Sequence, residues 1–213
     1  MAKRSNPKTR PAAGTEDRLL IAATRLFAEK GYDGTSTKEI CEAANANIAA
    51  LHYHFDSKEN LYLQIIRRFG SEWLDSALRV LSAPSDITEV RLRLEMFMNE
   101  MIVLSLKNID LLIIAQNESE SRHPRSQGVF QSTFKKAFET LLAFLTSAVK
   151  RNLLSRDVDP LIAGGMIFSM LTQAIRGNAQ GVKYFKLSLE DPAYRKKWIQ
   201  TATRIFLEGT IPR

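Results

Sequence analysis

The chain has 213 residues, of which 45% are apolar, and its formal net charge is +7. That length fits one or two domains with a sizeable core, and no run approaches the roughly 18–20 apolar residues of a membrane span. The single cysteine, Cys41, excludes an internal disulfide and is typical of proteins from a reducing compartment. We therefore expect a globular protein of the cytoplasm.

The positive charge is concentrated late in the chain. Residues 1–60 carry nine Lys and Arg against eight Asp and Glu, residues 61–124 seven against nine, and residues 125–213 fourteen against six. A high isoelectric point alone is therefore no argument for a nucleic-acid-binding domain at the amino terminus. Residues 1–14 have charge and proline without the apolar stretch of a secretory signal. We expect them to form a flexible basic arm that can follow a DNA backbone or enter a minor groove.

Local signals predict three short helices before residue 57. Thr15 can cap a first helix over about residues 16–30, which Gly31 ends. Ser36 and Glu39 have the spacing of a capping box and open a second helix. Asn45 can adopt the left-handed backbone conformation at low energetic cost. Asn47 is a good cap for a third helix beginning at Ile48. The arrangement predicts a helix, a tight turn and a second helix.

The third helix is predicted to have two different sides. Leu51 and Phe55 are one turn apart, so both point toward the first two helices. The opposite side carries small residues at its start and polar aromatic residues further on, which suits close approach to a DNA groove. From the residues alone, a plain amphipathic helix of a small bundle explains the pattern as well.

The rest of the chain also reads as helical. Pro84 interrupts the pattern, Asp86 can cap a helix, and residues 119–128 read as a loop. Asp159-Pro160 and Asp191-Pro192 combine a cap with a proline in the first helical position. Helices are expected over about residues 58–81, 87–107, 129–154 and 160–178, and from residue 192 through Phe206. No strand-like alternation persists, so the predicted fold class is all-α.

The amino-terminal pattern resembles the DNA-binding domain of TetR-type transcriptional repressors. The matching positions run without gaps over roughly residues 15–66: Leu26-Phe27, Gly31-Tyr32, Thr35-Ser36, Ile40, Ala43-Ala44, Leu51-His52-Tyr53-His54-Phe55, Ser57-Lys58-Glu59 and Leu61. Two positions depart from the family pattern, because Asn45 stands where glycine is usual and His52 where tyrosine is usual. The resemblance implies a three-helix domain over residues 15–62, with its helix-turn-helix at about residues 37–56. A long helix would join it to a helical effector-binding and dimerisation domain over residues 63–213, of about nine helices.

The resemblance also implies which residues meet DNA. Ala49, Ala50, His52 and Tyr53 would lie in the major groove, and Ile48 would touch a thymine methyl. Phosphates would be held by residues at helix starts and on the outer side of the third helix. The complete predicted set is Thr37, Lys38, Asn47, Ile48, Ala49, Ala50, His52, Tyr53, His54 and Lys58. For His54, packing inside the domain is the alternative.

Family likeness further implies a twofold-symmetric dimer and a cavity for a small, hydrophobic effector. Predicted interface residues are Gly164, Gly165, Ile167, Leu171, Trp198, Ala202, Ile205 and Phe206, with Met166 and Met170 adding apolar area. Predicted cavity residues are Phe69, Trp73, Phe97, Met101, Gln116, Phe134, Phe138, Met170, Gln173 and Arg176, within a wider set that includes Met98, Asn99, Phe130 and Phe168. In both cases the alternative is that the apolar residues form ordinary core.

No catalytic, metal or cofactor site is predicted. His52 and His54 are two residues apart on a helix and point about 200° apart, so they cannot share an ion, and His123 lies in a distant predicted loop. No nucleophile and base can be paired. The predicted function is a DNA-binding transcriptional regulator, a ligand-released repressor that binds a palindromic operator as a homodimer. The alternatives are an effector-independent DNA-binding protein and a helical protein-interaction module.

Overall fold

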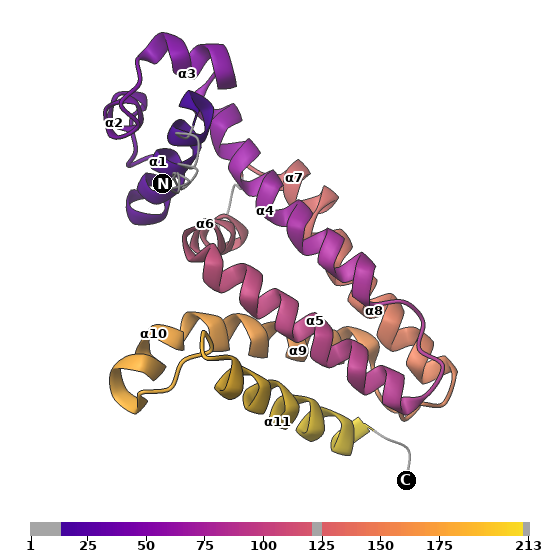
Figure 1. Ribbon diagram of the computed structural model, residues 1–213. Coiled ribbons are helices and arrows are strands. Elements are labelled where there is room, and N and C mark those ends of the chain that lie inside the picture. The colour runs from indigo at the N-terminus through magenta and orange to yellow at the C-terminus, as the bar shows by residue number, and fades with distance from the viewer. Residues whose placement is uncertain (1–13, 121–124, 211–213) are drawn as a thin grey trace, which may run out of the picture. The chain divides into compact units, whose positions relative to one another are not determined.

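A computed structural model describes residues 14–120 and 125–210, and Figure 1 shows the arrangement of their elements. These residues contain helices and no strand, which confirms the predicted fold class. They divide into two compact units, one ending at Ile65 and the other beginning at Ile66. Residues 1–13 of the predicted basic arm, and His123, lie outside the described residues.

The first unit contains α1 (Thr15–Lys30), α2 (Thr37–Ala43) and α3 (Ile48–Phe55), followed by the start of α4 (Lys58–Val80). Gly14, not Thr15, occupies the cap position of α1. The helix ends as predicted at Gly31, whose φ of 72° is easy for a residue without a side chain. The apolar faces of the helices meet in a small core that includes Leu19, Phe27 and Ile40.

The predicted capping box at the start of α2 is confirmed. The hydroxyl of Ser36 accepts a hydrogen bond from the Glu39 amide at 3.2 Å, and the Glu39 carboxylate accepts one from the Ser36 amide at 2.8 Å. Two of the amides that a helix start leaves unpaired are thereby satisfied. Lys30 adds an ion pair to the same carboxylate at 2.7 Å. The start of α2 is therefore held both by its own cap and by the end of α1.

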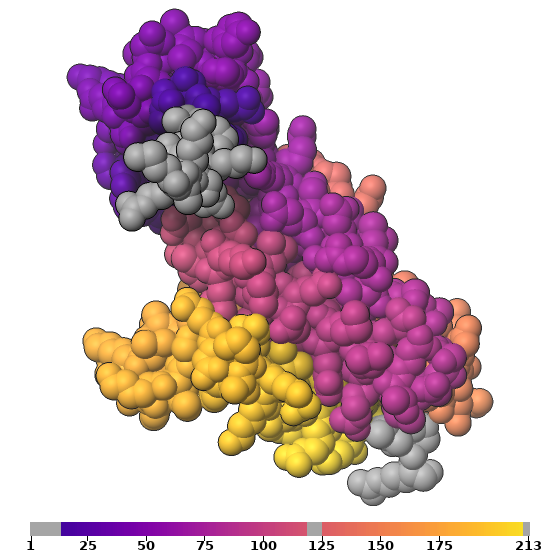
Figure 2. All heavy atoms as spheres, in the orientation of Figure 1, coloured from indigo at the N-terminus to yellow at the C-terminus, as the bar shows by residue number. Residues whose placement is uncertain are grey.

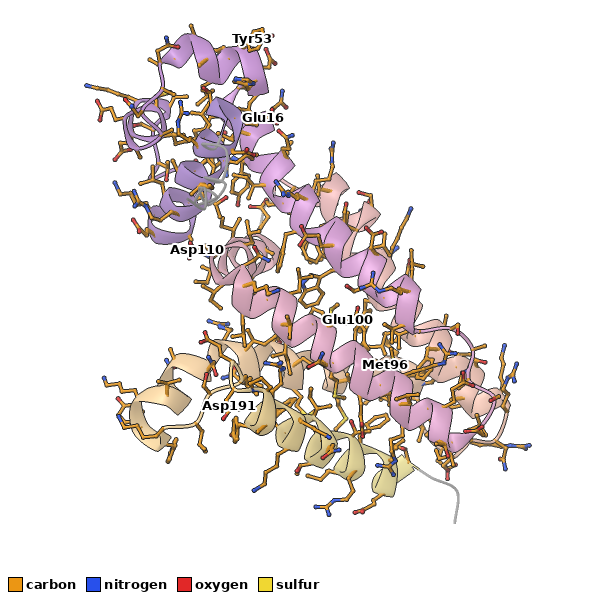
Figure 3. All side chains as sticks on the ribbon, viewed as in Figure 1. Glu16, Tyr53, Met96, Glu100, Asp110 and Asp191 are labelled. Atoms are coloured by element: carbon orange, nitrogen blue, oxygen red, sulfur yellow. The ribbon has the colours of Figure 1, made fainter. Side chains whose placement is uncertain are left out.

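The second unit begins within α4 and is built from further helices, whose bounds are α5 (Ile87–Lys107), α6 (Ile109–Glu120), α7 (Gln127–Ser132), α8 (Phe134–Lys150), α9 (Pro160–Arg176), α10 (Asn178–Gln180), the π-helix η1 (Gly181–Phe185) and α11 (Pro192–Thr210). Helix α5 packs against α9 and α11, and α8 packs against α7 and α9. Figure 2 shows α11 in yellow and η1 in orange at the surface of this unit. An ion pair of 2.7 Å between Arg79 and Glu100 links α4 to α5, and Glu100 is labelled in Figure 3.

Three predicted helix starts and one break are confirmed. Asp86 accepts a hydrogen bond from the Glu89 amide at 2.8 Å, Asp159 from the Leu161 amide at 2.7 Å. Asp191 likewise accepts one from the amide of Ala193 at 2.8 Å. The expected break after Lys107 separates α5 from α6. These signals are local, because a capping side chain and the amide that donates to it lie within three residues of each other.

The prediction of one helix over residues 129–154 is wrong. The helix is interrupted at Thr133, whose φ of −126° and ψ of −80° are not helical. The Thr133 hydroxyl donates to the carbonyl of Val129 at 2.7 Å, a side-chain bond that competes with the regular backbone pattern. Thr133 also lies against Gly70 of α4, where an added Cβ would be 2.3 Å from its hydroxyl oxygen. The interruption is therefore coupled to a close approach of α4.

The predicted loop at residues 119–128 is too long at both ends. Helix α6 continues to Glu120, and α7 already begins at Gln127. The π-helix η1 was not expected, and it leaves Tyr184 and Phe185 largely exposed.

Candidate DNA-recognition helix, cavity and exposed apolar face

The position of α3 is set by its buried side and its cap. Leu51 is 0% exposed and Phe55 is also buried, as their spacing predicts. Asn45 has a φ of 48°, which confirms the left-handed residue of the turn. The Asn47 side chain accepts a hydrogen bond from the Ala50 amide at 2.7 Å. The turn and the cap together fix which side of α3 faces away from the core.

The side of α3 opposite Leu51 and Phe55 is exposed. Tyr53 is 85% exposed and Ile48 is 50% exposed, while His52 and Ala49 are exposed as well. Figure 3 shows Tyr53 on the outer side of α3. Ala50 is half-buried. This surface is small near the start of the helix and aromatic and polar toward its end, which suits close approach to base edges.

The imidazole of His52 is held by the backbone at the end of α3. Its Nδ1 lies 2.5 Å from the carbonyl oxygen of Asp56, and the Asp56 amide donates to the His52 carbonyl at 2.9 Å. Asp56 has a φ of 66°, a backbone region that residues with side chains rarely enter. The pair of bonds therefore ties the side chain of His52 to a strained residue.

The other predicted DNA contacts have different surroundings. Thr37 is half-buried at the first position of α2, and Lys38 is exposed on the same helix. The ammonium of Lys38 lies 3.9 Å from Glu42, a distance at which an exposed pair contributes little. The Asn47 side-chain oxygen is engaged by the cap described above. Lys38 is therefore the predicted cation most accessible to a phosphate.

Lys58 has a role inside the first unit that the sequence did not reveal. Its ammonium donates to the carbonyls of Tyr32 at 2.8 Å and Thr35 at 2.7 Å, and it lies 4.0 Å from the centre of the Tyr32 ring. Such bonds tie the start of α4 to the segment between α1 and α2 and stabilise both. The predicted phosphate contact of Lys58 would have to share the ammonium with these two carbonyls.

His54 also faces its own unit. Its Nδ1 lies 3.9 Å from the carboxylate of Glu16 in α1, and its side chain is only 25% exposed. The orientation agrees with the packing alternative stated for this residue. A phosphate contact by His54 stays a prediction.

Two titratable groups of the first unit are shifted. The ion pair with Lys30, together with the two hydrogen bonds from Ser36, lowers the pKa of Glu39 to about 2. Burial raises the pKa of the Cys41 thiol, which lies in α2 next to Ile40. A buried thiol with a raised pKa is a small hydrophobic core residue and a poor nucleophile.

In the second unit, a cavity of about 240 Å³ lies between α4, α6, α7, α8 and α9. Its wall contains five predicted cavity residues, namely Trp73, Gln116, Phe134, Gln173 and Arg176. Phe130 and Phe168 of the wider set also line it, together with Leu112, Ala115, Ser169 and Thr172. The last two share a helix face with Gln173 and Arg176 at spacings of three and four residues, which is the signal that could have found them.

The remaining predicted cavity residues do not line this space. Phe69 is buried behind it and contacts the rings of Trp73 and Phe134. Phe138 touches the ring of Phe168 instead. Phe97 and Met101 are buried core residues of α5, and Met170 is half-buried on α9. Helical spacing alone does not separate cavity from core, because both contain the same residue types.

One polar atom of the cavity residues lacks a partner. The indole Nε1 of Trp73 is buried and has no hydrogen-bond acceptor among the described residues. A buried donor left unpaired costs about 1–3 kcal/mol. The rings of Phe69, Phe134 and Phe168 surround the indole edge to face, at centroid distances of 5.6–6.0 Å. A ligand acceptor that reached this N–H would remove the cost.

Half of the predicted dimer-interface residues are buried within a single chain. Ile167, Leu171 and Ala202 are buried within the chain. An added Cβ at Gly164 would lie 2.7 Å from Leu142, so this glycine allows α8 and α9 to pack closely in one chain. Their burial favours the stated alternative, in which these residues belong to the core of the chain. Gly165, Trp198, Ile205 and Phe206 are at least partly exposed.

Helix α9 also exposes Leu161 and Ile162, which were not predicted at the interface, next to Met166, which was predicted to add apolar area. Ile162 is 64% exposed and Met166 is 65% exposed, with Leu161 similarly exposed beside them, and Ile205 of α11 is 65% exposed. Three neighbouring aliphatic side chains in water on one helix are an uncommon surface for a protein that stays alone. We call Leu161, Ile162 and Met166 the α9 apolar face.

Two further kinds of feature are absent from the described residues. Within residues 14–120 and 125–210, no three His, Cys, Asp or Glu side chains gather as metal ligands would. None of the helices described is both long and apolar enough to cross a bilayer.

Comparison with protein families matches residues 19–65 to the bacterial regulatory proteins of the tetR family. The biofilm operon icaADBC HTH-type negative transcriptional regulator IcaR of Staphylococcus epidermidis is 38% identical over 64 residues, covering 30% of this chain and 35% of that protein. The chain thus aligns with about a third of the length of this curated relative.

Solved structures extend the likeness to the whole fold. The TetR family transcriptional regulator PfmR from Thermus thermophilus has a TM-score of 0.70 at 25% identity, over 90% of this chain and 98% of that one. The transcriptional regulator FadR from Bacillus subtilis, in complex with stearoyl-CoA, has a TM-score of 0.65 at 15% identity, over 90% and 95%. The exposed α3, the family match and these folds agree: residues 19–65 match the tetR family, and the described fold is similar to that of solved TetR-family regulators.

Proposed function

We propose that the protein is a sequence-specific DNA-binding repressor that binds its operator through α3. The observation that carries the proposal is the two-sided character of this helix. Leu51 and Phe55 are buried and hold the helix against the core of the first unit, while His52 and Tyr53 are exposed to solvent. Its relative IcaR is named as a negative transcriptional regulator, which supports repression over activation.

Selection of bound sequences from a random DNA pool, at a stated salt concentration, tests this function. A defined motif is expected for the wild type. Ala49→Glu places a negative charge on the exposed side of α3 and should abolish binding. Gln131→Glu adds the same charge at an exposed position of α7 and should leave binding intact. Recovery of no preferred sequence by the wild type would refute the proposal.

We propose further that two copies of the chain associate through the α9 apolar face and Ile205. Covering these apolar side chains removes them from water, which stabilises the dimer by roughly 1.5–3 kcal/mol for each side chain that becomes fully buried. A dimer with twofold symmetry would present two copies of α3 to two half-sites, so the selected motif should be a palindrome. Sedimentation equilibrium at micromolar concentration measures the association. A monomer there, or a motif without twofold symmetry, would contradict the assembly.

The cavity of the second unit is proposed as the effector site. Trp73, Phe130, Phe134 and Phe168 contribute aromatic rings to its wall, and α9 supplies polar groups from Ser169, Gln173 and Arg176. Arg176 has no hydrogen bond or ion pair with the described residues. It is exposed to solvent and also lines the cavity. The chemistry fits a compact apolar ligand with one acceptor for the Trp73 indole and an anionic end for Arg176.

The size of the cavity favours a smaller ligand than the stearoyl-CoA named for FadR. About 240 Å³ lies slightly below the roughly 300–1,000 Å³ of pockets for drug-sized molecules. A long acyl chain such as that of stearoyl-CoA would need the cavity to expand. We therefore propose a short or aromatic carboxylate in preference to a long-chain acyl thioester.

Release of DNA would proceed through α4, which carries both Trp73 and Lys58. Displacement of Trp73 by a ligand would move the helix whose first residue holds the carbonyls of Tyr32 and Thr35. The proposed result is a change in how the two copies of α3 are spaced.

A panel of aromatic and short-chain carboxylates, with stearoyl-CoA as the long-chain comparison, tests the coupling. Tryptophan fluorescence measures binding, and operator affinity is measured with and without each compound. Arg176→Gln should weaken the carboxylates and spare neutral analogues. A ligand that saturates the cavity without changing operator affinity would refute the coupling.

A further inference from the structure

The hydrogen bond between His52 and Asp56 determines where the imidazole carries its proton. A carbonyl oxygen can only accept a hydrogen bond, so the Nδ1 that lies 2.5 Å from it must be the donor. In a neutral imidazole the second nitrogen then has no hydrogen. The Nε2 of a neutral His52 is therefore a hydrogen-bond acceptor.

Two features keep the ring in this state. The Asp56 amide donates to the His52 carbonyl at 2.9 Å, so the two residues are joined by bonds in both directions. The Ser57 amide donates to the Phe55 carbonyl at 2.7 Å across Asp56, and this three-residue turn with φ 66° and ψ −45° is strained. Asp56 thus aims its carbonyl at the imidazole because the turn holds it there.

His52, which carries this second nitrogen, lies on the exposed side of α3. His52 is exposed, and it shares this side with Ala49 and Tyr53. The small side chain of Ala49, one turn earlier, allows the helix to approach a surface closely at that point. A partner that approaches α3 therefore meets an acceptor whose ring is already oriented.

We propose that His52 reads an exocyclic amino group in the major groove, either N4 of cytosine or N6 of adenine. Among the groups that bases present there, only these two donate a hydrogen bond. Guanine presents the acceptors N7 and O6, and thymine presents the acceptor O4. A lone pair of Nε2 facing those atoms would leave both without a donor, so guanine and thymine are rejected at this position. The inference rests on the proposed DNA binding through α3.

The first experiment finds the base that faces His52. Sequences are selected at about pH 8, where imidazoles in general are neutral, with the wild type and with His52→Ala. The position that loses its preference in the variant is the one read by His52. His52→Gln serves as a second variant, because its side chain also reaches the groove and its amide can both donate and accept. Circular dichroism shows whether each variant keeps its helices.

The second experiment tests single atoms of that base with the wild-type protein. If it is adenine, replacement by purine removes the N6 amino group, and replacement by 7-deazaadenine removes only N7. If it is cytosine, replacement by 2-pyrimidinone removes the N4 amino group, and 5-methylcytosine keeps it. Loss of the amino group should weaken wild-type binding about tenfold and leave binding by His52→Ala unchanged. The analogues that keep the amino group should change affinity less than twofold.

Nuclear magnetic resonance gives a readout that needs no variant. Long-range proton–nitrogen correlation of the imidazole should show hydrogen on Nδ1 and none on Nε2, in the free protein and in the complex. Hydrogen on Nε2 would overturn the inference, as would guanine or thymine at the selected position. A weakening caused by loss of N7 and not of the amino group would also overturn it, because His52 would then be a donor.

Failure of this inference differs from failure of the proposed function. If the wild type selects a motif and no position depends on His52, DNA binding stands and the reading by His52 is wrong. If the wild type selects no motif, both are wrong.

Discussion

Helices α3 and α9 each bury one side and expose the other, yet the exposed sides have different chemistry. The outer side of α3 presents an imidazole and a phenol, whose polar atoms can be satisfied by water. The α9 apolar face presents Leu161, Ile162 and Met166, which gain nothing from water. The exposed side of α3 is therefore stable in water and suited to a polar partner. The α9 apolar face, in contrast, lowers its free energy most when another surface covers it.

The largest expected effect concerns the buried sides. Leu51→Ala removes a side chain that is 0% exposed beneath α3 and should lower the free energy of unfolding by about 2–5 kcal/mol. Leu161→Ala removes the same atoms from the exposed face of α9 and should change the stability of a monomer by less than about 0.5 kcal/mol. Urea unfolding under monomeric conditions compares the two. Equal losses would mean that the two faces are not as different as their exposure indicates.

The next largest expected effect is on self-association, which we expect to depend on the α9 apolar face and not on an exposed position of α7. Met166→Glu should weaken self-association about a hundredfold, because a carboxylate would be buried in the contact without a partner. Gln131→Glu is the control with the same added charge. Sedimentation at several concentrations measures both. A dimer that tolerates the charge at residue 166 would place the contact elsewhere.

A smaller effect distinguishes the two lysines near α3. Lys58→Ala removes two charged hydrogen bonds to carbonyls and should lower the stability of the first unit by about 2 kcal/mol. Lys38→Ala should leave stability unchanged and reduce the slope of log affinity against log salt by about 0.9. Salt titrations of operator binding, with urea unfolding, test both. If Lys58→Ala lowers the slope equally while remaining folded, Lys58 also contacts phosphate.

The smallest expected effect is the loss of stability in acid, which we compare between the two units. The bonds from Ser85 and Arg93 lower the pKa of Glu89 at the start of α5 to about 2, as Lys30 and Ser36 do for Glu39. Since these values lie below the ordinary 4.5, the stability that each carboxylate contributes is complete above about pH 4.5. It is lost as pH falls toward 2.

Glu39→Gln and Glu89→Gln should therefore each be less stable than the wild type at pH 6, and the difference should shrink toward pH 2. Urea unfolding across this range provides the measurement. A difference that does not depend on pH would show that the lost interaction is not the ionised carboxylate.

The sequence predicted the first unit better than the second for a physical reason. Ser36, Asn45 and Asn47 act within a few residues, so their caps and turn can be recognised in the chain itself. The break at Thr133 depends on the approach of Gly70, which is distant in sequence. Long-range contacts of this kind leave no periodic signal.

The candidate sites follow the same rule. Spacing identified the buried pair Leu51 and Phe55, but it could not show that the Lys58 ammonium binds carbonyls 23 and 26 residues away. Gly164 was expected between two chains, since small residues permit close packing of either kind. The structure shows that its neighbour is Leu142 of the same chain.

The burial of Cys41 has a practical consequence for measuring how the assembly moves. It is the single cysteine in the sequence, and its thiol is buried, which raises its pKa. A cysteine introduced at Tyr53 or Gln131 would therefore take a spin label or fluorophore selectively, without first removing the native thiol. Label-to-label distances across a pair of protomers could then report directly on the spacing of the reading helices before and after an effector is added.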